Sequence, residues 1–280
     1  MSDAAFQFVR QLGADLAAGE FDLPPFPDTA LKVQQCVSDP DSDIQSLAAI
    51  VATEPALAAR LMRMANSAMM RRGPMEVTDI NTAISRVGMD MVQNAAVSFA
   101  ARTAFKCPPG AACGKDLDAL RDRCVQVASL SYVLAAGSKY PGKPDEAMLA
   151  GLLHAVGKLY IFMKAADHPE LFTDRSALEA LIGQWHTGVA RAIVESWGFP
   201  ESIAVGVDEQ EIKERDRIAM GDLSDILFIC NLLARAGTNA AAQLGDLDAL
   251  ARLRMDADGL AELLSEKEEE IQSMVEALKG

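Results

Sequence analysis

The stretch GLLHAVGKL, Gly151 to Leu159, places a single histidine in an otherwise apolar run. An imidazole in such surroundings is either a hydrogen-bonded core residue or part of a functional site. The spacing of the apolar residues around His154 predicts a helix that begins at Pro144 or Asp145 and includes the histidine. The role of His154 then depends on the ligands, bases and nucleophiles that the rest of the chain can bring to it.

Helical periodicity extends along nearly all of the 280 residues. Half of the residues are apolar but only 5% are aromatic, and Ala, Leu, Val and Met supply most of the apolar share. Such residues lose little side-chain entropy in a helix. We find no strand-length alternation bounded by hairpin turns and no repeat of fixed period. The sequence therefore predicts an all-α fold, a multi-helical bundle.

Local signals predict where the helices begin and end. The first amphipathic helix is expected over residues 3–18 and the last over 258–278. Between them we expect N-caps at Asp28, at Ser42 (with Gln45 in capping-box spacing), at Thr78 or Asp79, at Ser176 and at Asp222 or Ser224, Pro55 in a first turn, and Gly88 as a C-cap.

The segment KCPPGAACGK, residues 106–115, is the strongest internal boundary, because proline and glycine cluster there and the periodicity stops. The last amphipathic helix either packs back on the domain or pairs with another chain, and about three heptads favour packing. The expected organisation is an N-terminal helix at 1–20, an N-terminal helical part at 21–105, a connecting loop at 106–115, a second helical part at 116–240 and a C-terminal extension at 241–280.

Charge and cysteine content limit the partners and the location. The net charge of −14 would repel a polyanion, which disfavours nucleic acids and anionic membranes as partners. Five cysteines, an odd number without a CxxC pair, are typical of reduced thiols in a cytoplasm. The N-terminus has no signal-peptide pattern, and no stretch reaches about 18 uninterrupted apolar residues. We therefore expect a soluble, cytoplasmic protein.

The common catalytic motifs are absent from the sequence: there is no P-loop, GxGxxG, GxSxG or HExxH. The three histidines are His154, His168 and His186. His168 lies in a turn and is expected to be solvated. His154 and His186 lie in expected helices on apolar backgrounds, where a structural role is the ordinary one.

Several stretches, in order, resemble the HDOD family, the HD-related output domains of bacterial signalling. The resemblance covers roughly residues 20–237 and rests on LPPFPDTALKVQQCVSDPDSDIQSLAAIVATEPALAARLMRMANSA (23–68), INTAISRVGMDMV (80–92), EAMLAGLLHAVGKL (146–159), LIGQWHTGVARAIVESWGFPESI (181–203) and ICNLLARAG (229–237). It implies an N-terminal helical subdomain packed on an HD-like helical subdomain. In the parent HD fold, histidines and aspartates from successive helices hold metal ions that activate a water for attack on a phosphoester.

Compared with that pattern, the ligand set of this chain is incomplete. His154 is followed by Ala155, so the carboxylate of the HD dyad is missing, and Arg123 stands near the early-helix histidine. His186 remains, while Gln210 and Glu211 fall near the later histidine pair. A metal site needs at least three protein ligands, and an arginine repels a cation. We therefore expect no bound metal, no cofactor and no catalytic residue.

The residues that we expect in a remnant binding site are His154, His186, Arg123 and Asn66. Asn66 ends an expected helix over 54–66. Its amide either caps that helix or ties the N-terminal helices to the HD-like half.

Three functions remain open at this stage. The first is a non-enzymatic signal-transduction module that acts through a protein partner or a small ligand. The second is a weak metal-dependent phosphohydrolase acting on a nucleotide or another phosphoester. The third is a DNA-binding regulator, since residues 43–52 and 54–66 resemble a helix-turn-helix whose second helix carries Arg60 and Arg63. The apolar loading of that helix disfavours the third.

Overall fold

The prediction of an all-α fold is confirmed. The structure, a computed structural model, describes residues 25–67, 76–213, 219–238 and 247–279, together with positions 8, 10, 13–14, 70, 241 and 244. This part of the chain is helical and contains no strand. The helix expected over 3–18 and most of the loop expected over 69–77 lie outside the described residues.

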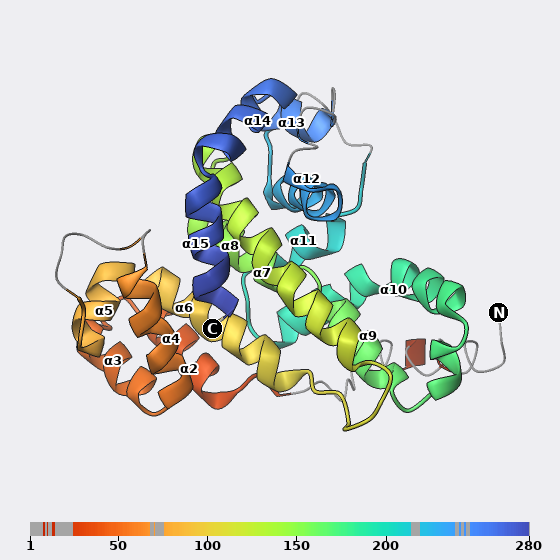
Figure 1. Ribbon diagram of the computed structural model, residues 1–280, viewed down its shortest axis with the longest axis horizontal. Helices are drawn as coiled ribbons and strands as arrows, with labels where there is room; N and C mark the ends of the chain where they lie inside the picture. Colours follow the sequence, from red (N-terminus) through yellow and green to blue (C-terminus); the bar gives the residue numbers. More distant parts are fainter. Residues whose placement is uncertain are drawn as a thin grey trace.

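An N-terminal helical subdomain packs on an HD-like helical subdomain, as the resemblance implied (Figure 1). The first contains α2 (Asp28–Ser38), α3 (Ile44–Ala52), α4 (Pro55–Asn66), α5 (Ile80–Val87) and α6 (Met89–Ala104). The second contains α7 (Gly114–Gly137), α8 (Pro144–Leu153), α9 (Val156–Ala165), the short 3-10 helix η1 (Pro169–Phe172), α10 (Arg175–Ser196), α11 (Glu201–Glu209) and α12 (Leu223–Ala236). The chain then continues through α13 (Asp248–Arg252), α14 (Ala257–Glu266) and α15 (Glu268–Lys279).

Two glycines bring the central helices into backbone contact. A Cβ atom on Gly151 of α8 would lie 2.5 Å from Cα of Ala128 on α7. A Cβ atom on Gly157 of α9 would lie 2.0 Å from the backbone oxygen of His186 on α10. Real Cβ atoms do not come so close to other atoms, so glycine is required at both positions for these helices to approach as they do.

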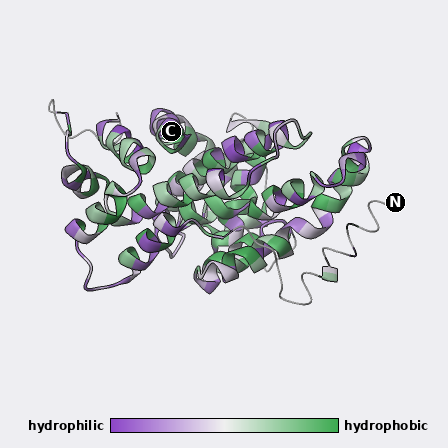
Figure 2. Cartoon of the chain, turned by 90° about the horizontal axis from the view of Figure 1, so that it is seen from below, coloured by the Kyte–Doolittle hydropathy of each residue, from purple (hydrophilic) through white to green (hydrophobic). Residues whose placement is uncertain are grey.

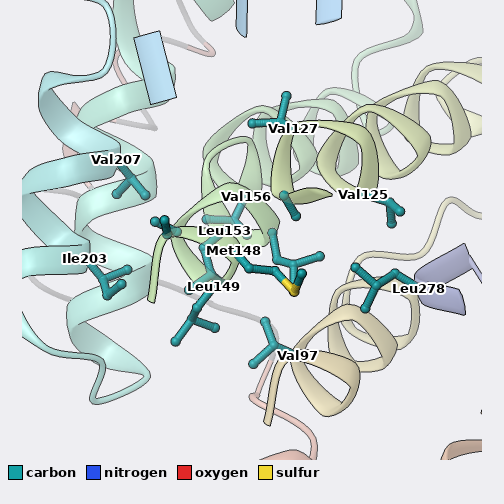
Figure 3. Close-up of a cluster of buried hydrophobic side chains, with 14 of the residues drawn as sticks. Val97, Val125, Val127, Met148, Leu149, Leu153, Val156, Ile203, Val207 and Leu278 are labelled. Atoms are coloured by element: carbon teal, nitrogen blue, oxygen red, sulfur yellow. The ribbon is translucent and has the colours of Figure 1, made fainter. Parts of the chain in front are cut away.

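Helix α8 lies at the centre of the hydrophobic core. Its residues Met148, Leu149 and Leu153 pack in one cluster with side chains from several neighbouring helices (Figure 3). Hydrophobic residues gather between the helices and polar residues toward the outside (Figure 2). Residues 144–165 are long and apolar enough to cross a membrane by length and composition, but 83% of the most apolar window is buried, as in the core of a soluble protein.

The C-terminal extension packs back on its own chain, where α15 lies against α7, α4 and α6 (Figure 1). The Arg60 guanidinium donates to the carbonyl oxygen of Lys279 (2.9 Å), and the Ser98 hydroxyl donates to that of Leu278 (3.0 Å). Arg102 also donates to the Lys279 carbonyl (2.6 Å). These donors satisfy the last carbonyl groups of α15, where a cation is also favoured by the helix dipole.

Several expected helix ends are off by a residue or two. Pro27, not Asp28, precedes α2, so the Asp28 carboxylate lies in the first turn. Asp43 caps α3 in place of Ser42, because its carboxylate accepts from the backbone N–H of Ser46 (2.8 Å). Asp174 caps α10 in the same way, two residues before the expected Ser176. In each case an aspartate or a proline within two residues of the expected cap forms the boundary.

Other boundaries agree with the prediction, with one exception. Asp79 and Asp222 are N-caps, Pro55 lies in the first turn of α4, and Gly88 ends α5 with a φ of 90°. The helix expected over 258–278 is instead two helices that meet at Lys267, and Asp256 caps the first of them.

The expectation of reduced thiols is wrong for one pair of cysteines. Cys107 and Cys113 form a disulfide, with their Cα atoms 6.0 Å apart. The intervening PPGAA turn folds the chain back on itself, since Ala111 N–H donates to the Pro108 carbonyl and Gly110 has a φ of 83°. The other three cysteines are buried thiols.

The contact at Gly157 predicts a large difference between two glycine substitutions. Gly157→Ala should destabilise the protein by about 3 kcal/mol or more, because the new methyl group overlaps a backbone oxygen of α10. Gly188→Ala, in the exposed interior of α10 with no atom near its Cβ position, should stabilise it by up to about 1 kcal/mol. Urea unfolding of both variants measures the two effects, and equal effects would contradict the helix packing described here.

Candidate functional site

His154 lies at a break between two helices, not inside one helix as expected. It is the C-cap of α8, and α9 begins at Val156. Its ring Nδ1–H donates to the Gly151 carbonyl (2.7 Å), which leaves Nε2 as the unprotonated nitrogen. Only 1% of the residue is exposed, and this burial lowers its pKa to about 3. His154 is therefore a neutral imidazole at physiological pH.

A chain of buried amides holds the backbone at this break. The Gln210 side chain donates to the His154 carbonyl (2.8 Å), and Asn231 on α12 donates to the Gln210 side-chain oxygen (2.9 Å). All three residues are buried. The His154 carbonyl, which has no partner within a helix, thereby accepts a hydrogen bond from Gln210 at the end of α11, and Asn231 of α12 holds Gln210 in place.

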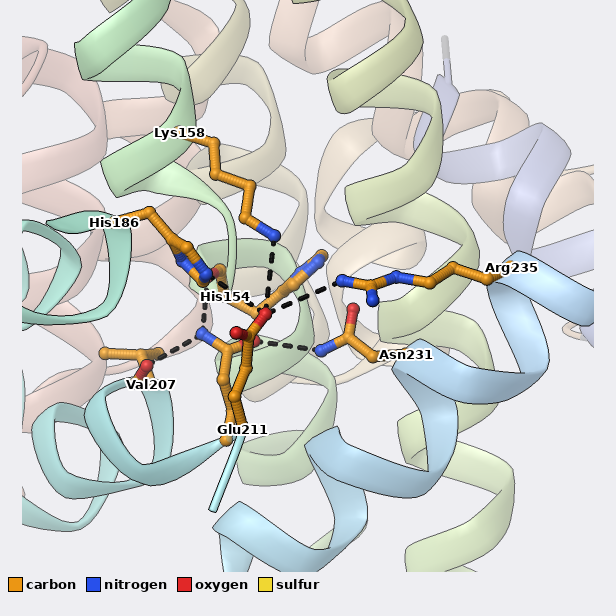
Figure 4. Close-up of polar contacts among 8 residues, drawn as sticks. His154, Lys158, His186, Val207, Glu211, Asn231 and Arg235 are labelled. Atoms are coloured by element: carbon orange, nitrogen blue, oxygen red, sulfur yellow. Dashed lines mark hydrogen bonds and ion pairs between the residues drawn. The ribbon is translucent and has the colours of Figure 1, made fainter. Parts of the chain in front are cut away.

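Glu211, two residues after the end of α11, is contacted by three side chains from three helices (Figure 4). The His186 ring Nε2–H on α10 donates to its carboxylate at 3.0 Å. Lys158 on α9 lies 3.6 Å from the same oxygen and Arg235 on α12 lies 3.5 Å from it. The hydrogen bond from His186, together with the charges of Lys158 and Arg235, lowers the pKa of Glu211 to about 2.

The pKa values of His186 and Lys158, two neighbours of this carboxylate, are both lowered. Burial lowers the pKa of His186, while the hydrogen bond to Glu211 and its charge act in the opposite direction. Burial also lowers the pKa of Lys158, and the nearby Arg235 and Arg123 act in the same direction, while Glu211 opposes them. Lys158 and Arg235 thus lie close to the Glu211 carboxylate, and Arg123 lies near enough to Lys158 to lower its pKa.

Arg123 on α7 and these residues line one side of a cleft of about 540 Å³. Within the described ranges, the Arg123 guanidinium has no hydrogen bond or ion pair. At another part of the cleft, Arg175 makes two bonds to Asp116, at 2.5 and 2.9 Å. The side chains of Leu120, Phe162 and Ile182 form an apolar part of the cleft lining.

The fourth candidate, Asn66, lies elsewhere in the molecule. Its side-chain oxygen accepts from the N–H of Val77 (2.8 Å), and its amide donates to the carbonyl of the same residue (2.9 Å). Both residues belong to the N-terminal subdomain, and Ser67 is the C-cap of α4. Asn66 therefore holds the segment before α5, and the idea that it ties the two subdomains together is wrong.

Sequence reasoning missed two members of the cluster, Lys158 and Arg235. Lys158 lies four residues after His154, and Arg235 lies four residues after Asn231 on α12. An i to i+4 spacing places two residues on the same helix face, which was a usable signal for Arg235. For Lys158 the signal was weaker, because the break at His154 interrupts the helix.

The protonation states of the site limit its chemistry. A general base works best with a pKa near the working pH. Glu211, with its pKa near 2, and His154, with its pKa near 3, both hold protons too weakly for that role. The cluster is better suited to hold a charge than to transfer a proton.

The buried state of His154 predicts that its ring does not titrate near neutral pH. Because its folded pKa is lowered, the stability that it contributes is present above pH 6.5 and is lost as the pH falls toward 3. The His154 ring signal in ¹³C–¹H NMR should stay constant between about pH 8 and pH 5, where a free imidazole titrates. His154→Asn assigns the signal, and a midpoint near 6.5 would show that the ring is open to water.

Comparisons with known proteins agree with this architecture. The HDOD domain model matches residues 23–212. An uncharacterized protein from Treponema pallidum (strain Nichols) is 25% identical over 214 residues, which are 69% of this chain and 38% of that protein. The chain therefore spans well under half the length of this curated relative.

Solved structures share the fold over nearly the whole chain. A candidate metal-dependent phosphohydrolase from Shewanella amazonensis SB2B is 25% identical, with a TM-score of 0.78 over 99% of this chain and 100% of its own. An HDOD domain protein of unknown function from Geobacter sulfurreducens is 20% identical, with a TM-score of 0.67 over 95% and 99% of the two chains. A candidate signal transduction protein from Marinobacter aquaeolei VT8 is 22% identical, with a TM-score of 0.62 over 99% and 67%. The family match covers most of the sequence, and this chain belongs to the HDOD domain family.

Proposed function

We propose that this protein is a non-enzymatic, cytoplasmic signal-transduction module of a bacterium, in which cationic side chains have replaced the metal of the HD site. It acts by binding, through a protein partner or a small ligand. The observation that carries the proposal is the sharing of Glu211 among His186, Lys158 and Arg235. Positive charge that a metal ion would supply in an HD enzyme comes here from the protein itself.

The residues present do not fit a resident metal ion. A metal site needs three or more protein ligands, and cationic neighbours raise the free energy of a bound cation. His154 and His186 supply two imidazoles, but the Glu211 carboxylate is already engaged. In the part of the chain that the structure describes, no group of three or more His, Cys, Asp or Glu residues is arranged to hold a metal.

The two other functions have weaker support. A phosphohydrolase is favoured only by the likeness to the Shewanella protein, and Glu211 and His154 are poor bases. For DNA binding, the expected helix pair is present as α3 and α4, but Arg60 is only 4% exposed and donates to Lys279 and Ser98. An arginine held in this way is not available to a DNA backbone.

An activity assay tests the non-enzymatic proposal. Protein purified without a histidine tag should show no hydrolysis of bis(p-nitrophenyl) phosphate or of nucleoside monophosphates above a protein-free blank, with Mn²⁺, Fe²⁺, Zn²⁺ or Mg²⁺ supplied. Turnover that His186→Ala removes and that the surface variant Lys139→Gln retains would overturn the proposal and establish a phosphohydrolase.

A further inference from the structure

We propose that the cleft between α7, α9, α10 and α12 binds the doubly charged oxyanion group of a small ligand directly, through Arg123, Lys158 and Arg235 and without a metal. This inference rests on the proposed function and names the ligand class of the same site. The ligand is a dianionic phosphate or phosphonate with a small apolar body.

One part of the cleft carries an excess of positive charge, although the protein as a whole is negatively charged. The cleft lining holds four cationic side chains and three carboxylates in a chain whose net charge is −14. Asp116 and Glu179 pair with Arg175, which leaves Arg123, Lys158 and Arg235 with the single carboxylate of Glu211. Repulsion between these like charges raises the free energy of the unliganded site. An oxyanion between these side chains removes that repulsion, and two unbalanced charges match a dianion.

Arg123 is the group best placed to contact the oxyanion. It has no hydrogen-bond or ion-pair partner among the described residues, although its side chain lines the cleft. A guanidinium offers two parallel donors that fit a phosphate or carboxylate edge. Lys158 and Arg235 are partly engaged by Glu211 at 3.6 and 3.5 Å, distances that leave donor capacity for a second acceptor.

The cleft also has a direction. Arg175 is neutralised by its bonds to Asp116 and by Glu179 (3.3 Å), so this part of the wall carries no excess of positive charge. Leu120, Phe162 and Ile182 provide apolar surface in the same cleft. The charged group of the ligand is therefore expected at Arg123 and Lys158. Its apolar body is expected against Leu120, Phe162 and Ile182. The cleft volume of about 540 Å³ is in the range of small-molecule binding sites.

Isothermal titration calorimetry with phenylphosphonate tests the inference, because this dianion carries an aromatic body and is not hydrolysed. At mildly alkaline pH, we expect saturable one-to-one binding, weaker binding of inorganic phosphate and no binding of neutral benzyl alcohol. Arg123→Gln should raise the Kd about tenfold or more, the loss expected for one charge-assisted contact. Lys115→Gln removes one charge from an exposed site on the same helix and should change the Kd by less than about twofold.

Further arms of the experiment separate its possible failures. Arg235→Gln serves as a second cleft variant, and a thermal melt of each variant confirms folding. Absence of saturable binding to the wild-type protein, or equal weakening in Arg123→Gln and Lys115→Gln, would overturn the oxyanion site and leave the non-enzymatic proposal standing. Binding that EDTA abolishes would mean that a metal holds the anion, which would overturn both.

Discussion

The contact between Gly157 and the backbone oxygen of His186 is the constraint on which the rest of the site depends. It holds α9 and α10 closer than any side chain would permit, and Gly151 does the same for α8 and α7. Between these two contacts the helix is interrupted at His154 and Ala155. The break directs Lys158 from the start of α9 toward the carboxylate that His186 also contacts.

This packing explains why an HD-like site can persist without the chemistry of an HD enzyme. Bringing an imidazole, a lysine and an arginine to one carboxylate is a costly arrangement in a partly buried place. Ion pairs of this kind contribute little net stability, so the cluster does not explain why the fold is stable. The hydrophobic core around α8 does that, and it leaves the cluster available for recognition (Figure 3).

The sequence was sufficient for the fold class and for the order of most helices. Of the four residues expected in a remnant site, Arg123 and His186 line one cleft, whereas His154 is buried beside it and Asn66 lies in the N-terminal subdomain. Apolar periodicity and capping residues report on local structure, and the family resemblance supplied the long-range arrangement. The disulfide and the role of Asn66 were not predictable in this way, because each depends on how a loop folds back. Lys158 was missed because the helix break at His154 interrupts the spacing, whereas the spacing of Arg235 from Asn231 on α12 was a signal that was not used.

The measurement that tests the central claim most directly is the metal content of protein purified without a histidine tag, by elemental analysis, beside the His154→Ala variant. If cationic side chains have replaced the metal, both preparations should contain far less than one equivalent of Fe, Mn or Zn. About one equivalent in the wild-type protein that is lost in His154→Ala would contradict the claim, because it would show a working metal site at this histidine.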